Sequence, residues 1–138
     1  MIPKSLEAQV SPFPQQQEKK RILIIDDYVD VTDSLAQWLR VAGHTVETAY
    51  TGEQAIEVAA AFKPQIILLD IGLPDSSGFE IAKQLRALPN QEEFLLVAVT
   101  GYGQESMRKA VLQAGFDEHF AKPMNPIKFL SIGIDIRT

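Results

Sequence analysis

The chain has 138 residues, which suits one compact domain and leaves little room for a second hydrophobic core. Its hydrophobic content of 46% and charged content of 22% are typical of globular proteins and argue against a wholly disordered chain. A formal net charge of −5 gives no general attraction to nucleic acid, and the absence of cysteine excludes disulfides, thiol catalysis and cysteine-ligated metals.

Residues 1–20 are predicted to form a flexible tail or linker ahead of a domain at residues 21–138. This segment carries three prolines and a run of glutamines, and it has few apolar side chains that could pack. It lacks the apolar centre of a secretion signal, and no apolar run in the chain approaches the roughly 20 residues of a membrane-spanning helix. We therefore expect a cytoplasmic domain that makes no membrane contact.

From Arg21 onward, short apolar runs alternate with segments of helical period, as in repeated βα units. Three of the runs contain no polar residue, which is typical of strands buried on both faces of a parallel sheet. A more polar run predicts an edge strand, and a short late run predicts a fifth strand. In chain order, the predicted strands cover residues 22–25, 45–49, 66–69, 94–99 and 119–121.

Apolar residues at helical spacing predict a helix after each strand. In the first helix they are Val31, Leu35, Trp38, Leu39 and Ala42, and this pattern places Trp38 in the core. The later helices are predicted from their ends: one stops before Pro64, one begins at a capping box of Ser77 and Glu80, one stops at Gly115, and a short last one begins at Asn125. With right-handed crossovers, these units predict a doubly wound three-layer α/β sandwich.

Polar residues follow four of the predicted strands: Asp26 and Asp27, Asp70, Thr100, and Lys122. The carboxyl ends of parallel strands share one edge of a sheet, so these side chains are expected to meet there. Three carboxylates in one place repel one another unless a cation lies among them, and Mg²⁺ prefers such oxygen ligands. One carboxylate could then attack phosphorus and form an acyl phosphate, while the lysine and the hydroxyl neutralise charge on the transferred group.

The residues around these strand ends resemble a known family. They are ILIIDD at 22–27, IILLDIGLPDSSGFE at 66–80, VAVTGYG at 97–103 and AGFDEHFAKP at 114–123. Over about residues 21–132 the chain is similar to the receiver domains of response regulators and hybrid sensor kinases. This resemblance implies a five-stranded parallel sheet of order 2-1-3-4-5, which is the flavodoxin-like arrangement, with a short last helix.

The resemblance also implies the chemical roles of the acidic residues. Asp70 is expected to be the phosphoacceptor, receiving a phosphoryl group from a phosphohistidine. Asp26, Asp27 and Asp70, together with the backbone carbonyl of Gly72, are expected to hold the cofactor Mg²⁺.

Four further expectations follow from the same resemblance. Thr100 and Lys122 would contact the phosphoryl oxygens, and Thr100 would be coupled to His119, which stands at the family's aromatic switch position. The peptide bond between Lys122 and Pro123 would be cis.

The expected partners are a histidine kinase or histidine phosphotransfer domain and an unknown downstream protein, with no direct nucleic-acid binding. The domain is expected to be a monomer that signals and does not turn over substrates. One alternative is a receiver-like interaction module that is never phosphorylated. Another is an aspartyl-phosphate phosphatase of the haloacid dehalogenase type, although Gly72 stands where such enzymes carry a second aspartate. A freestanding regulator and a fragment of a hybrid kinase both remain open.

Overall fold

The computed structural model describes residues 19–73, 77–89, 91, 93–101 and 108–122. Within these residues five strands form one parallel sheet, in the order β2-β1-β3-β4-β5. The strands are β1 (Arg21–Ile25), β2 (Thr45–Ala49), β3 (Ile66–Asp70), β4 (Leu95–Thr100) and β5 (Glu118–Ala121). The predicted sheet and its strand order are confirmed.

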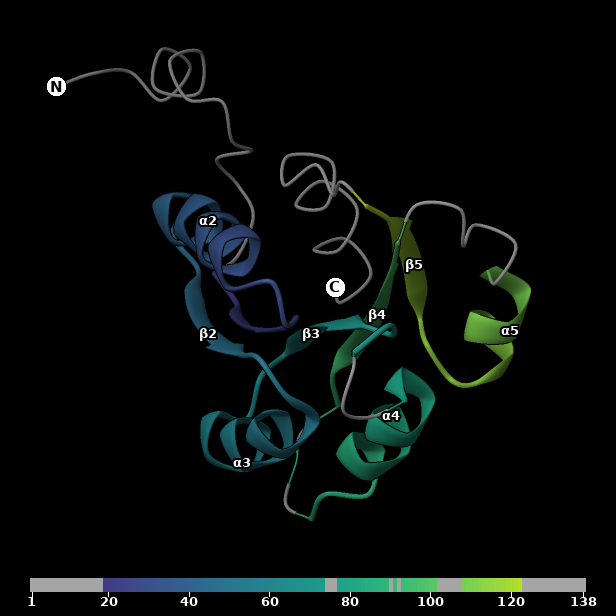
Figure 1. Ribbon diagram of the computed structural model, residues 1–138. Coiled ribbons are helices and arrows are strands. Elements are labelled where there is room, and N and C mark those ends of the chain that lie inside the picture. The colour runs from purple at the N-terminus through teal and green to yellow at the C-terminus, as the bar shows by residue number, and fades with distance from the viewer. Residues whose placement is uncertain (1–18, 74–76, 90, 92, 102–107, 123–138) are drawn as a thin grey trace, which may run out of the picture.

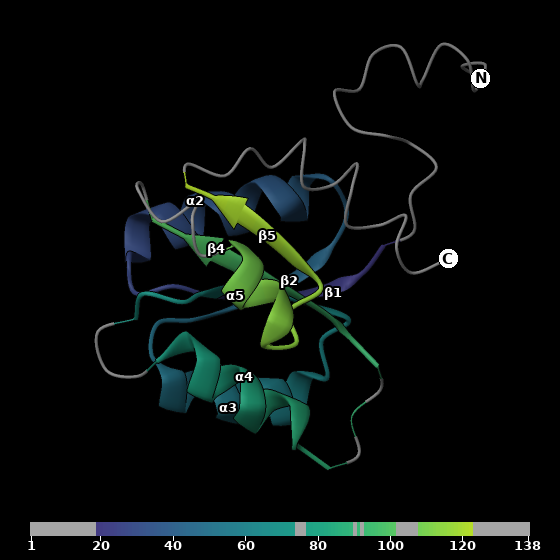
Figure 2. The same ribbon diagram turned by 90° about the vertical axis from the view of Figure 1, so that its right-hand side faces the viewer.

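The helices cover both faces of this sheet (Figures 1 and 2). Helix α2 (Val29–Val41) lies on one face, and α3 (Gly52–Phe62) and α4 (Gly78–Arg86) lie on the other. The short helix α5 (Arg108–Gln113) buries Val111 in the same hydrophobic cluster as α3 and α4. The three-layer sandwich is therefore confirmed. The predicted last helix lies outside the described residues, and no described helix has the length and apolar character needed to cross a bilayer.

Alternation along the strands separates the core into two halves. Leu23, Ile67, Leu96 and Ala98 contribute to the half on the side of α3, α4 and α5. Their neighbours along the strands contribute to the half that α2 covers; these include Ile22, Ile24, Ile66, Leu68, Leu95 and Val97. Because successive side chains point to opposite faces, strands buried on both sides must be apolar at every position. The uninterrupted apolar runs in the sequence have this origin.

The ends of three helices follow from local chemistry. Gly43, two residues after α2, has a φ of +104°, the left-handed geometry that the sequence predicts there. Helix α3 ends at Phe62, before Pro64, and Lys63 between them takes a φ of 52°. Ser77 caps α4 as predicted, since its hydroxyl accepts a hydrogen bond of 3.2 Å from the amide of Phe79.

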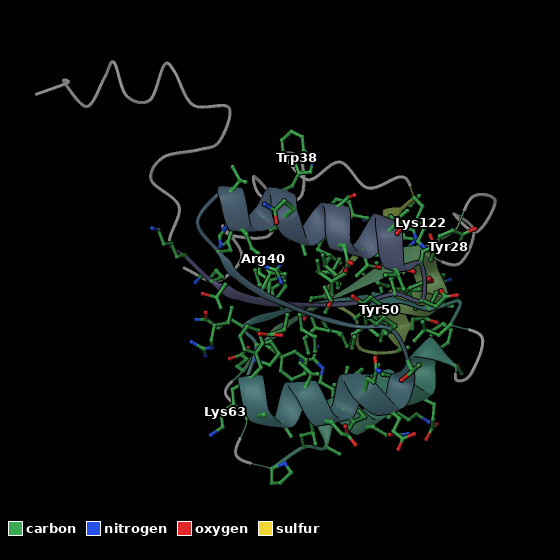
Figure 3. The ribbon with its side chains drawn as sticks, turned by 60° about the vertical axis from the view of Figure 1, so that its left-hand side comes forward. Tyr28, Trp38, Arg40, Tyr50, Lys63 and Lys122 are labelled. Atoms are coloured by element: carbon green, nitrogen blue, oxygen red, sulfur yellow. The ribbon has the colours of Figure 1, made fainter. Side chains whose placement is uncertain are left out.

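The predicted core position of Trp38 is wrong. Helix α2 buries Thr32, Ala36 and Leu39, whereas Trp38 is 47% exposed and points away from the sheet (Figure 3). The face of α2 that is buried therefore begins one residue later, at Thr32, than the face predicted from apolar side chains, which begins at Val31. The small side chain of Ala36 lets the helix lie close to the sheet, and the Thr32 hydroxyl is satisfied by a 2.6 Å hydrogen bond to the carbonyl oxygen of Tyr28.

Arg86 and Asp117 join the beginnings of β4 and β5. The Arg86 guanidinium donates to the carbonyl oxygens of Phe94 and Gly115 and forms a 3.0 Å ion pair with Asp117. The same Asp117 oxygen accepts a hydrogen bond of 2.8 Å from the amide of Leu96. These contacts help to fix the register of the two strands that carry Thr100, His119 and Lys122 toward the opposite end of the sheet.

His44 lies buried at the junction between α2 and β2. Its Nδ1 accepts a hydrogen bond of 2.9 Å from the amide of Lys20, so the neutral ring carries its proton on Nε2. A second proton would have to bind Nδ1 and break this contact. Burial, followed by the positive charges of Lys20 and Lys19, lowers the pKa of His44 below its ordinary value of 6.5.

The pKa of His44 predicts a loss of stability in mild acid. Since the folded-state pKa is below the unfolded one, the unfolded chain binds more protons as the pH falls through about 6.5, and the free energy of unfolding decreases. His44→Asn keeps an acceptor for the Lys20 amide and removes the titration. Urea unfolding across a pH series should show a smaller acid loss in the variant. Equal pH slopes in the two proteins would contradict the assignment.

Candidate functional site

Three aspartates form an acidic cluster at the carboxyl end of the sheet. Asp26 directly follows β1, Asp27 comes next, and Asp70 is the last residue of β3. One carboxylate oxygen from each lies within 4.8 Å of the other two. Asp26 and Asp70 are buried, with 7% and 6% exposure, whereas Asp27 is exposed. Because β1 and β3 are adjacent and parallel, their ends bring these groups together, as the sequence predicts.

Backbone amides hold the two buried carboxylates. Oδ1 of Asp26 accepts a hydrogen bond of 3.0 Å from the amide of Tyr28, and Oδ1 of Asp70 accepts one of 2.9 Å from the amide of Gly72. The amide of Asp26 donates to the carbonyl oxygen of Ala49 on the neighbouring strand, at 3.0 Å. Each carboxylate is thereby oriented with its second oxygen, Oδ2, available to other groups.

Lys122, which directly follows β5, connects the two buried carboxylates. Its amide donates to the carbonyl oxygen of Thr100 at 2.8 Å, which continues the pairing of β4 and β5 to the edge of the sheet. Its ammonium lies 3.0 Å from Oδ2 of Asp26 and 3.0 Å from Oδ2 of Asp70. Burial alone would lower the pKa of Lys122, but the hydrogen bonds and charges of Asp70 and Asp26 outweigh it and raise the pKa above its ordinary value. Lys122 is therefore a cation at neutral pH.

Tyr28 flanks this ammonium at the rim of the cluster. Figure 3 shows Tyr28 and Lys122 together at the end of the sheet where α2 begins, far from Lys63 at the opposite end. The Lys122 nitrogen lies 6.0 Å from the centre of the Tyr28 ring, at the outer limit of a cation–π contact. Sequence reasoning missed Tyr28, because a single exposed tyrosine beside a pair of aspartates carries no spacing signal.

The donor atoms of the cluster suit a divalent cation. Three carboxylates and one ammonium sum to a formal charge of −3 + 1 = −2. In an octahedral Mg²⁺ site with ligands at about 2.1 Å, opposite ligands are about 4.2 Å apart. The carboxylate oxygens lie within 4.8 Å of one another, so small side-chain rotations bring them into range. The residues present therefore fit a hard metal ion in both charge and geometry.

Thr100 contacts His119, the residue to which the family resemblance couples it. It is fully buried, and its hydroxyl lies 2.8 Å from Nε2 of His119, which is also buried. In the described part of the chain, the carboxylates of the acidic cluster contact the Lys122 ammonium and backbone amides. The amide of Gly72 is one of these, because it donates to Asp70. Pro123 lies outside the described residues, and so does the predicted cis peptide bond before it.

The fold and the site together define a class of protein: a doubly wound α/β domain with an acidic cluster and a lysine at the carboxyl edge of its sheet. Comparison with protein families then identifies the group within that class. Residues 22–132 match the response regulator receiver domain, so the chain belongs to this family of two-component signalling domains.

Individual relatives agree with the family. An uncharacterised 14.6 kDa protein of Leptolyngbya boryana is 31% identical over 111 residues, covering 80% of this chain and 85% of the relative. The response regulator MprA of Mycobacterium ulcerans is 36% identical over 103 residues, covering 75% of this chain. The alkaline phosphatase synthesis transcriptional regulatory protein PhoP of Bacillus subtilis is 35% identical over 107 residues, covering 78%. This chain spans 44% of the length of MprA and 44% of PhoP.

Solved structures show the same fold. A CheY-like receiver domain protein from Methanospirillum hungatei is 33% identical with a TM-score of 0.73, covering 83% of this chain and 90% of that one. A response regulator from Burkholderia pseudomallei, solved with a phosphorylated aspartic acid, a calcium ion and citrate, is 28% identical with a TM-score of 0.74. That match covers 84% of this chain and 66% of the Burkholderia chain.

Proposed function

We propose that this receiver domain takes a phosphoryl group from a phosphohistidine onto Asp70 and thereby changes its affinity for a partner protein. The observation that carries the proposal is the Lys122 ammonium, which bridges Asp26 and Asp70 at 3.0 Å beside a third carboxylate. This arrangement supplies a nucleophile, a cation for the transferred group and ligands for a metal ion in one place. The phosphorylated aspartic acid in the Burkholderia relative supports the same chemistry.

In the proposed reaction, a carboxylate oxygen of Asp70 attacks phosphorus. The new O–P bond replaces the P–N bond of the phosphohistidine, and the imidazole leaves with a proton. Lys122 already contacts Oδ2 of Asp70 and neutralises charge on a phosphoryl oxygen as that charge develops. The Gly72 amide holds Oδ1 of Asp70 and so fixes the orientation of the nucleophile. Thr100 supplies a hydroxyl to another phosphoryl oxygen.

Asp26, Asp27 and Asp70, with the carbonyl oxygen of Gly72, would hold Mg²⁺. When bound, the ion supplies positive charge that lets the anionic nucleophile and the anionic phosphoryl group approach each other. Asp27 is the exposed member of the three, which suits a ligand that reaches the ion from the solvent side. The calcium ion in the Burkholderia structure supports a divalent site in the family.

The proposed partners are a histidine kinase or a histidine phosphotransfer domain and a downstream protein that recognises the switched surface. The domain itself is proposed to cover residues 21–138 and to work as a monomer in the cytoplasm. Its contribution is phosphorylation-dependent signalling without turnover of small phosphate esters. Gly72 lacks a side chain that could act as the second acid of an aspartyl-phosphate phosphatase.

Incubation of the intact chain with acetyl phosphate and Mg²⁺, followed by intact mass measurement, tests the proposal. We expect a gain of one phosphoryl group in the wild type and in Asp30→Asn, which removes an exposed carboxylate of α2 outside the cluster. Asp70→Asn should gain none, because the amide is not a nucleophile. A wild type that stays unmodified would indicate the interaction-module alternative, and uptake that persists in Asp70→Asn would place the acceptor elsewhere.

A further inference from the structure

Tyr28 stands where α2 begins, but its side chain contributes little to the helix or the core. It occupies the N-cap position, where Ser, Thr, Asp or Asn is preferred because the side chain bonds to the first amides. The Tyr28 side chain makes no such capping bond. Its ring is 66% exposed, so only a small part of its apolar surface is removed from water. Neither capping nor core packing explains an aromatic ring at this position.

The backbone of Tyr28 is nevertheless held firmly beside the acidic cluster. Its amide donates to Oδ1 of Asp26 at 3.0 Å. Its carbonyl oxygen accepts hydrogen bonds from the amide of Thr32 at 2.9 Å and from the hydroxyl of the same residue at 2.6 Å. Since Asp26 belongs to the cluster, these contacts fix the point from which the ring projects at the rim of the site.

The reacting groups lie on the face of the sheet that carries Tyr28. Asp70 follows Leu69, whose side chain lies in the core half under α3, α4 and α5, so alternation places Asp70 on the α2 face. The Lys122 ammonium lies 3.0 Å from Oδ2 of Asp70 and 6.0 Å from the centre of the Tyr28 ring. The ring centre and Oδ2 of Asp70 are therefore separated by no more than the sum of these two distances.

A phosphoryl donor at Asp70 brings its leaving group toward this ring. Phosphoryl transfer is in line, so the leaving group lies on the side of phosphorus away from Asp70. In a near-attack geometry phosphorus is about 3–3.5 Å from the attacking oxygen, and the leaving group begins one bond further out. Two aromatic rings interact when their centres are about 4.5–7 Å apart. An aromatic leaving group on this phosphorus is thus within reach of the exposed Tyr28 ring.

We propose that Tyr28 is a specificity-determining residue that recognises the imidazole ring of the phosphoryl donor. A donor ring protonated on its second nitrogen carries positive charge, which the face of the Tyr28 ring attracts. As the O–P bond to Asp70 forms, the P–N bond breaks, its electron pair stays on nitrogen, and the ring leaves as neutral imidazole. This inference rests on the proposed function, and it adds the feature by which the domain favours phosphohistidine over donors without a ring.

The other role open to the ring is to hold the Lys122 ammonium. The 6.0 Å separation is at the outer limit of a cation–π contact. Such a contact would act through Lys122, which faces the phosphoryl group whatever leaving group that phosphoryl group carries. It would therefore change the rate with every donor alike, whereas recognition of the donor ring changes the rate only with donors that contain one.

Two small donors with a P–N bond separate these roles. Phosphoimidazole carries the ring, and phosphoramidate releases ammonia in its place. With the intact chain and Mg²⁺, initial rates of mass gain give the ratio of phosphoimidazole to phosphoramidate reactivity. We expect Tyr28→Leu, which keeps an apolar side chain without a ring, to lower this ratio roughly 2- to 5-fold, the range for one exposed cation–π contact. Tyr28→Phe keeps the ring and should leave the ratio at the wild-type value.

Trp38→Leu is the matched control. It removes another exposed aromatic ring of α2, which Figure 3 shows further along the helix from the end that carries Tyr28 and Lys122. Its ratio should equal that of the wild type. An unchanged ratio in Tyr28→Leu would overturn the inference, and so would an equal loss in Tyr28→Phe, which would assign the effect to the hydroxyl. If phosphoramidate modifies the wild type and not Asp70→Asn, either result overturns this inference alone; if neither donor modifies the wild type, the proposed function fails with it.

Discussion

Lys122→Met is expected to slow phosphorylation of Asp70 by roughly 10²- to 10³-fold, the usual effect of removing one group that stabilises charge in a transition state. The ammonium lies 3.0 Å from Oδ2 of Asp70, so it is already placed where charge would develop on the phosphoryl oxygens. Methionine has a similar length and no charge, which preserves packing around the stem of the side chain. The rate of mass gain with acetyl phosphate at saturating Mg²⁺ measures the effect.

The same substitution should strengthen metal binding. Without Lys122 the formal charge of the cluster changes from −2 to −3, and a repelling cation is removed. Two unit charges about 4 Å apart repel by about 1 kcal/mol in water and about 4 kcal/mol at an effective dielectric constant of 20. We therefore expect Mg²⁺ affinity to rise by about tenfold or more in calorimetric titration. Lys83→Met, which removes an exposed lysine of α4, controls for net charge. Weaker Mg²⁺ binding in Lys122→Met would contradict this reading of the cluster.

The sheet and the acidic cluster could both be predicted from the sequence, for one physical reason. Strands of a parallel sheet are buried on both faces, so they are visible as apolar runs, and the residue after each run lies at a known edge. Because Asp26, Asp70 and Lys122 stand at the ends of such strands, this rule alone predicts that they lie close together. The structure adds that the ammonium contacts Oδ2 of both carboxylates.

The contact between Thr100 and His119 could not be predicted from the strand ends, and only the family resemblance implied that these two residues are coupled. Thr100 is the last residue of β4, and its hydroxyl can turn toward the edge or toward a neighbouring strand. The register of β5 decides the outcome, because a shift of one residue would move His119 to the other face. Contacts far from the site help to fix that register, including those of Arg86 and Asp117. No local pattern in the sequence reveals them.

The orientation of α2 escaped prediction for a related reason. Two stripes run side by side along this helix, and apolar character favours the one with Val31 and Trp38. The structure buries the one with Thr32 and Ala36, because close contact with the sheet and satisfied hydrogen bonds outweigh side-chain hydrophobicity there. The rotation of a helix about its axis is thus a packing property of the whole domain.

Gly78→Ala should destabilise the domain strongly. Gly78 begins α4, and a Cβ atom at this position would lie 2.4 Å from Cα, 2.7 Å from Cβ and 2.9 Å from Cγ2 of Ile71. The nearest of these is a backbone atom, so no change of rotamer relieves the clash. Overpacking of this kind costs about 1–3 kcal/mol or more, against a gain in helix propensity of about 1 kcal/mol or less. We expect a net loss of about 2 kcal/mol in the free energy of urea unfolding.

The clash would also reach the site, because Ile71 stands between Asp70 and Gly72, and its amide donates to the carbonyl oxygen of Val99 at 3.1 Å. Moving Ile71 would displace the Asp70 carboxylate from Lys122, so phosphorylation should fall further than the loss of folded protein explains. Gly72→Ala is the matched control for stability: among the described residues, its Cβ would meet only Oδ1 of Asp70, at an ordinary 3.4 Å. Its unfolding free energy should stay within about 1 kcal/mol of the wild type. If Gly78→Ala proved as stable as Gly72→Ala, the close approach of α4 to the Asp70 loop would be refuted.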